Sequence, residues 1–135
     1  MPTKTAHAWE TKNLLKQVTA IRHGLPVSDV QVLVEYFKVS QAIVAEVLRI
    51  TPRTLERRIT DHQRLKPDES ERVVRLGAVF QLSIEVLGSA EAAQGWFKKP
   101  RAELGGDTPF AHCDTEPGRI EVERVLGRIA DGVYA

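Results

Sequence analysis

Three arginines and a threonine crowd into one short stretch near the middle of the chain: Arg53, Thr54, Arg57 and Arg58. A guanidinium group binds a phosphate, or two edge atoms of guanine, through paired N–H donors, so this composition favours a helix that contacts DNA. Arg53 and Arg57 are four residues apart and share one helical face, which makes them the predicted base contacts, with Thr54 beside them. A solvated arginine-rich helix within a bundle, with Glu56 pairing locally, is the alternative.

The residues on either side of this stretch have the layout of a helix-turn-helix over residues 41–59. Ala45 is small where two helices would cross, and the turn is flanked by the apolar anchors Val44, Leu48, Ile50 and Leu55. Arg49 occupies a turn position where glycine often supplies a left-handed backbone, so we expect a turn that is looser or differently shaped. Phosphate contacts are expected from Arg58, Arg64 and the first amides of the preceding helix. The full predicted DNA-binding set is Ser40, Gln41, Thr51, Arg53, Thr54, Arg57, Arg58 and Arg64.

The other residue types that do chemistry are scattered. His112, Cys113 and Asp114 are adjacent, and adjacent side chains point in different directions, so they cannot form a relay from base to nucleophile. Cys113 is the single cysteine, and the four histidines have no metal-ligand spacing. We therefore expect no enzymatic activity, no cofactor and no metal.

Helical spacing recurs along the chain, whereas strand patterns are nearly absent. Gly24-Leu25-Pro26 and Gly88 are helix stops, Ser28 and Gln31 read as a capping box, and Ser40, Thr51, Ser89, Thr108 and Thr115 are predicted N-caps. The prediction is an all-α chain of seven or eight short helices.

The helix predicted over residues 67–87 is apolar on two sides. Such a helix lies between two layers or across a subunit boundary. Two-fold symmetry also matches palindromic operators, so we expect a homodimer. The residues predicted to form its interface are Val73, Leu76, Phe80, Ile84 and Leu87.

Composition limits the class of protein. The chain has 135 residues, 42% of them hydrophobic and 27% charged, as in an ordinary globular protein. Without an eighteen-residue apolar run or a secretory pattern at Met1–Glu10, we expect a cytoplasmic protein with no membrane partner. The net charge of +1 conceals +5 over residues 1–66 and −4 over residues 103–135, which suggests two different partners.

The C-terminal part of the sequence carries a specific order of short motifs. They are Trp96-Phe97-Lys98-Lys99-Pro100, Leu104-Gly105-Gly106-Asp107-Thr108-Pro109, Asp114-Thr115-Glu116-Pro117-Gly118, Glu121-Val122-Glu123 and Leu126-Gly127-Arg128-Ile129, followed by Gly132-Val133-Tyr134. This segment closely resembles the toxin-binding domain of the Xre/MbcA/ParS antitoxins, and residues 25–88 resemble the Xre-like helix-turn-helix domain that precedes it. Lys66, where a hydroxyl cap often stands, and His112-Cys113, where aliphatic residues usually sit, depart from the family pattern.

The resemblance implies a type II antitoxin. Such a protein sequesters a RES-domain toxin that consumes NAD⁺ and represses its own operon by binding operator DNA. It further implies that the C-terminal end blocks the toxin active site, with Arg128, Gly132, Val133, Tyr134 and Ala135 facing the toxin. The expected division is an arm or docked helix over residues 1–24, a DNA-binding and dimerisation domain over 25–88 and a small helical toxin-binding domain over 89–135. A transcription regulator or adaptor with another protein partner is the alternative.

Overall fold

The computed structural model describes residues 6–132, and this part of the chain is built from helices without a strand. In chain order the elements are the 3₁₀ turn η1 (Ala8–Glu10), α1 (Leu14–His23), α2 (Ser28–Phe37), α3 (Gln41–Leu48), α4 (Pro52–Thr60), α5 (Pro67–Leu87), α6 (Ala90–Phe97), the 3₁₀ turn η2 (Ala102–Leu104), α7 (Pro109–His112) and α8 (Glu116–Ala130). The prediction of an all-α chain is confirmed.

Local signals set most helix ends. The side chains of Ser40, Thr51, Ser89, Thr108 and Thr115 each accept a backbone N–H of the first turn that follows, as predicted. Gly24 and Gly88 end α1 and α5 with positive φ angles of 91° and 96°. The capping box at Ser28 was wrong: α2 begins one residue earlier than expected, with Val27 as N-cap, and the Gln31 amide instead donates to Gln41. The first turn of α5 replaces a hydroxyl cap with Glu69, whose carboxylate accepts the Lys66 N–H at 2.8 Å.

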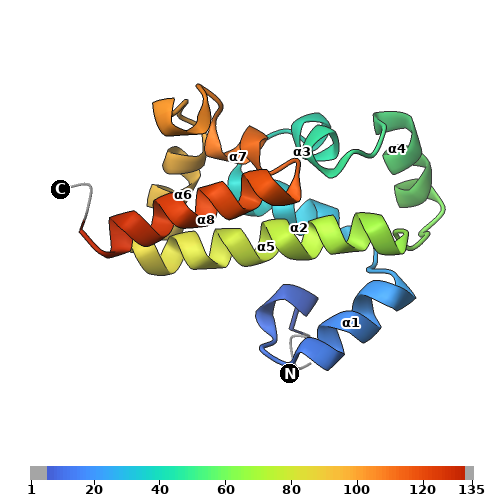
Figure 1. The fold of residues 1–135 in the computed structure, drawn as a ribbon. Coiled ribbons are helices and arrows are strands. Elements are labelled where there is room, and N and C mark those ends of the chain that lie inside the picture. Colours follow the sequence, from blue (N-terminus) through green and yellow to red (C-terminus); the bar gives the residue numbers. More distant parts are fainter. Residues whose placement is uncertain (1–5, 133–135) are drawn as a thin grey trace.

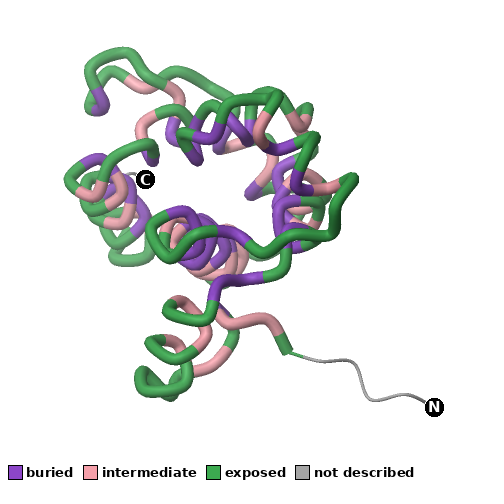
Figure 2. The backbone as a smooth tube through the Cα atoms, turned by 90° about the vertical axis from the view of Figure 1, so that its right-hand side faces the viewer, coloured by how far each residue is buried: buried purple, intermediate pink, exposed green. Residues whose placement is uncertain are grey.

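The long helix α5 organises the fold (Figure 1). α2, α6, α8 and the η1–α1 segment all pack against it, and α8 lies alongside it and runs in the same direction. Figure 2 looks along α5 and shows the buried positions gathered where the helices face one another. α4 and the last turn of α8 lie at opposite ends of the long axis.

One aromatic cluster joins the two halves of the chain. The Phe37 ring of α2 lies 4.9 Å from Phe80 of α5, 5.0 Å from Phe97 of α6 and 4.8 Å from Phe110 of α7, measured between ring centroids. All four phenylalanines are buried. The segments on either side of residue 88 thus share a core, and the boundary there stays a prediction.

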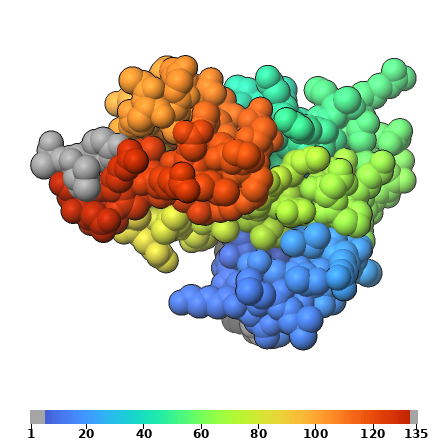
Figure 3. Space-filling model, viewed as in Figure 1, coloured from blue at the N-terminus to red at the C-terminus, as the bar shows by residue number. Residues whose placement is uncertain are grey.

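The N-terminal segment is docked on the body of the chain. Trp9 is 5% exposed, its Nε1 donates to the Tyr36 hydroxyl at 3.3 Å, and its ring lies against Gly77 of α5. Figure 3 shows the segment as a lobe beneath α5. Of the two readings of residues 1–24, the docked helix holds for the residues described.

No single helix in residues 6–132 has the length and apolar character to cross a membrane. α5 and α6 together would have that length and apolar character, but they are bent by 114° relative to each other, and nine of the 21 residues of α5 are buried in the protein.

Candidate nucleic-acid and partner interfaces

The turn between α3 and α4 brings the arginine-rich helix to the surface. Arg49 ends α3 in the left-handed conformation, with φ 58° and ψ 39°. The Ile50 N–H donates to the Ala45 carbonyl at 3.0 Å, and Thr51 then caps α4, with Pro52 at its first position. Arg49 therefore supplies the left-handed residue itself, and the turn is not looser for lack of glycine.

The two predicted base contacts are presented to solvent. Arg53 and Arg57 are exposed, and no ion pair is found for either within residues 6–132. Thr54 is half-buried, and its hydroxyl is bonded to the Thr51 hydroxyl at 2.8 Å. α4 thus offers two unpaired guanidinium groups on one face, which is the arrangement that guanine or phosphate recognition needs.

Arg58 corrects one sequence-based expectation. Its side chain is buried, and its guanidinium binds the equally buried Glu69 carboxylate of α5. It is therefore an internal tie between two helices and is unavailable to a phosphate. The sequence spacing already indicated that Arg58 is buried, because Arg58 lies three residues after the buried Leu55 and therefore shares its helical face.

The remaining predicted DNA contacts are partly engaged within the chain. Arg64 is exposed but donates from Nη1 to the Gly24 carbonyl at 2.9 Å. The Ser40 hydroxyl caps α3, and the Gln41 side chain accepts from Gln31 at 2.6 Å. What the start of α3 still offers is its first backbone N–H groups, beside a hollow of about 290 Å³ between α3 and α4.

The predicted dimerisation stripe is also corrected. Val73, Leu76 and Phe80 are at most 2% exposed because α2, α6 and α8 cover them, and Ile84 and Leu87 are half-buried. The two apolar sides of α5 serve two layers of one chain. Large exposed apolar side chains lie instead on α1, where Leu14, Leu15 and Val18 are 72%, 73% and 38% exposed.

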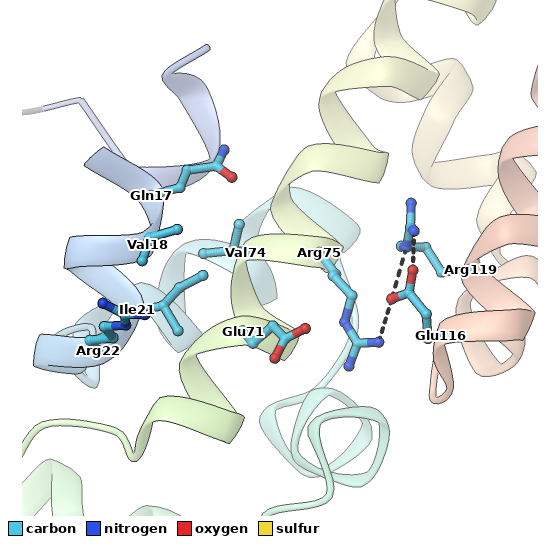
Figure 4. A pocket seen from close by; sticks show the side chains of 9 residues that line it. All are labelled: Gln17, Val18, Ile21, Arg22, Glu71, Val74, Arg75, Glu116 and Arg119. Carbon is cyan, nitrogen blue, oxygen red and sulfur yellow. Dashed lines mark hydrogen bonds and ion pairs between the residues drawn. The ribbon is translucent and has the colours of Figure 1, made fainter. Parts of the chain in front are cut away.

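Ion pairs fix the beginning of α8. Arg75 of α5 binds Glu116 at 2.7 Å, and Arg119 also binds Glu116 (Figure 4). Arg119 binds Glu123 as well, at 2.6 Å. Hydrogen bonds from Arg119 and then Arg75 lower the pKa of Glu116 to about 2. Arg75, Glu116 and Arg119 line one side of a groove of about 510 Å³, and residues of α1 line the other side. α8 is thereby held against α5 and carries the C-terminal end outward.

Two of the predicted toxin-facing residues, Arg128 and Gly132, lie at that outer end. Arg128 is exposed on α8 and lines a small hollow with Glu103, Glu121 and Arg124, and Gly132 follows the helix with φ 75°. Val133, Tyr134 and Ala135 fall outside the described residues.

His112 and Cys113 have structural roles. His112 joins Asp107, through Nδ1 at 2.9 Å, to Glu121 of α8, through Nε2 at 3.0 Å, and these hydrogen bonds raise its pKa. Cys113 is buried, and this desolvation raises the pKa of its thiol to about 12. Residues 6–132 hold no group of three or more His, Cys, Asp or Glu side chains suited to a metal ion.

Two family models match the chain in tandem. The antitoxin Xre-like helix-turn-helix domain matches residues 16–77, and the antitoxin Xre/MbcA/ParS C-terminal toxin-binding domain matches residues 83–132. An Antitoxin Xre from Yersinia enterocolitica is 31% identical over 145 residues, covering 95% of each chain. The chain belongs to the Xre antitoxin family. The helix-turn-helix match begins within α1, so α1 is part of the family domain and not only an arm.

Further relatives agree with this assignment. An Antitoxin Xre from Photorhabdus laumondii is 29% identical and covers 85% of this chain and 78% of its own length. A Prs ADP-ribosylating antitoxin from Sphingobium is 28% identical over 88% of this chain and 80% of its own length. A chain of the MbcT-MbcA toxin-antitoxin complex of Mycobacterium tuberculosis has the same fold, with a TM-score of 0.59, 22% identity and coverage of 81% of this chain and 96% of the other.

Proposed function

We propose that this chain is a type II antitoxin that neutralises a cognate RES-domain, NAD-consuming toxin and represses its own operon. The observation that carries the proposal is the pairing, in one chain, of a helix-turn-helix segment with a segment that matches a toxin-binding domain. That an MbcA-like fold occurs in a toxin-antitoxin complex supports it.

Repression is assigned to α4. Arg53 and Arg57 would read base edges in the major groove of operator DNA, and the start of α3 would bind a flanking phosphate. The net charge of +5 over residues 1–66 favours approach to DNA.

Neutralisation is assigned to the end of α8. The C-terminal residues, beginning at Arg128, would enter the toxin active site. The net charge of −4 over residues 103–135 suits a pocket lined with basic groups that bind NAD⁺. Because α4 and this end lie at opposite ends of α5, one chain has room for both partners.

A homodimer in the cytoplasm is part of the proposal, with the interface moved from α5 to the exposed apolar side chains of α1. Leu14→Ser with Leu15→Ser should then shift the sedimenting species toward the monomer, and a monomeric wild type at micromolar concentration would refute the dimer.

The test is co-expression with the neighbouring gene, following growth and cellular NAD⁺. The full chain should restore both, whereas a chain lacking residues 130–135 should restore neither and should still repress an operator reporter. If the full chain changes neither growth nor NAD⁺, a regulator with a different partner is the better account.

A further inference from the structure

The segment before the helix-turn-helix is fastened to the loop that follows α4. The Leu65 N–H donates to the Leu25 carbonyl at 2.9 Å, and Arg64 Nη1 donates to the Gly24 carbonyl at 2.9 Å. Pro26 and Arg64 also form an isolated antiparallel bridge. Gly24 is packed so closely that a Cβ there would lie 2.4 Å from the Leu65 carbonyl oxygen. The end of α1 and the segment that follows α4 are therefore joined directly by backbone and side-chain contacts.

A hollow of about 620 Å³ opens beside this junction, and we call it the N-terminal hollow. Among the side chains that line it are His7, Lys16, His23, Asp29 and Arg64. The Asp29 carboxylate is buried and is bound to His7 Nδ1 at 3.2 Å, so this acid already has a partner. The rest of the charged lining is basic, namely Lys16 and Arg64, with the imidazole of His23 beside them.

These cationic groups lack a counter-charge within residues 6–132. Lys16 and His23 are exposed, and neither side chain has an ion pair or hydrogen bond there, whereas the bond of Arg64 goes to a neutral carbonyl. Neither Lys16 nor Arg64 is bound to an acid in this part of the chain, so an anion in the hollow would be attracted to both of them. The hollow is also lined by Ala6, Ala8 and Ala20, whose short side chains leave the charged groups accessible to a ligand.

We propose that the N-terminal hollow binds a backbone phosphate of DNA beside the groove that α4 enters, with Lys16 and His23 as contacts that join Arg64. The inference rests on the proposed DNA binding. A helix in the major groove, which is about 12 Å wide, has a phosphate backbone on either side of it. In this arrangement the start of α3 contacts the backbone on one side of the groove. The loop after α4, together with the attached end of α1, contacts the backbone on the other side. α1 and α4 reach the same end of the molecule, which is consistent with this (Figure 1).

The test measures Kd at several salt concentrations for the operon's own promoter and for an unrelated duplex. Lys16→Ala should weaken binding to both by about fivefold and reduce the slope of log K against log salt by about 1, leaving the ratio of the two affinities unchanged. His23→Ala should likewise weaken binding to both duplexes relative to the wild type. Lys12→Ala is the matched control, because Lys12 is an exposed lysine of the same segment that does not line the hollow.

The outcomes distinguish a failure of the phosphate site from a failure of the proposed DNA binding. Equal slopes for wild type and Lys16→Ala, or the same loss in Lys12→Ala, would overturn the phosphate site, whereas the DNA function would stand if Arg53→Ala with Arg57→Ala abolishes promoter binding. If the wild type shows no preference for the promoter at any salt concentration, operator recognition fails and the inference falls with it.

Discussion

Arg58 and Glu69 form a buried ion pair that joins the last turn of α4 to the first turn of α5. The same carboxylate accepts the Lys66 N–H, so Glu69 also caps α5. The orientation of the exposed Arg53 and Arg57 on α4 thus depends on the buried Arg58.

Arg58→Ala should destabilise the chain by about 3–5 kcal/mol, because it leaves a buried carboxylate without its cation. The free energy of unfolding from guanidinium titration measures this loss. Glu56→Ala, at an exposed position of the same helix, should stay within about 0.5 kcal/mol of wild type. An unchanged midpoint for Arg58→Ala would mean that the pair does not hold α4.

Arg53→Ala combined with Arg57→Ala should abolish specific promoter binding, since both guanidinium groups on the exposed face are lost. Toxin neutralisation should persist, because the end of α8 is remote from α4. Fluorescence anisotropy with labelled promoter, together with growth under toxin co-expression, checks both. Simultaneous loss of the two activities in a folded variant would show that the halves are not separable.

Gly77→Ala should release the N-terminal segment. A Cβ at Gly77 would lie 2.3–2.6 Å from ring atoms of Trp9, and because alanine has no side-chain torsion to turn it away, the ring has to move. Displacing the ring should cost about 1–3 kcal/mol, more than the helix propensity gained. Limited proteolysis should then cleave before residue 24, and Gly95→Ala, where nothing lies within 4 Å, is the control. Equal protease resistance would argue against the docked segment.

The bridge through His112 should make stability depend on pH. Its pKa is raised in the folded chain, so the stabilisation is fully present below the ordinary value of 6.5 and is lost as pH rises through the raised value. The difference in unfolding free energy between wild type and His112→Gln should therefore be largest near pH 6 and shrink toward pH 9. A difference that stays constant over this range would contradict the bridge to Asp107 and Glu121.

Cys113 should resist thiol reagents in the folded state. The thiol is buried and its pKa is raised to about 12, so little thiolate exists at pH 8. Reaction with dithionitrobenzoate should be slow in buffer and complete in denaturant, and the single cysteine makes the signal unambiguous. Equal rates under the two conditions would show that the sulfur is not buried.

Short-range signals in the sequence predicted the helices well, because a hydroxyl before proline or a glycine after an apolar stripe acts within one turn. Thr51, Thr115 and Gly88 are examples. Ser28 failed because Val27 already adopts helical angles, with φ −60° and ψ −23°, which moves the start of α2. Arg49 shows that a long side chain accepts a left-handed backbone when the turn demands it.

Long-range partners were not predictable in the same way. That Val73, Leu76 and Phe80 face α2, α6 or α8, and not a second chain, depends on how the helices fold back. The burial of Trp9 was not predictable, because in the sequence it is a single aromatic residue in a polar stretch. Its partners Tyr36 and Gly77 lie far from it along the chain. The candidate site on α4 was predicted as a helix face, and the structure separated the exposed Arg57 from Arg58, whose buried partner Glu69 lies on another helix.

The most direct test of the central claim is the rate of NAD⁺ loss catalysed by the purified product of the neighbouring gene, with this chain added in equimolar amount. The account predicts that the full chain suppresses NAD⁺ loss and that Val133→Ser with Tyr134→Ser restores most of it, whereas Lys12→Ala suppresses it fully. NAD⁺ loss that proceeds at the same rate with and without the full chain would contradict the account.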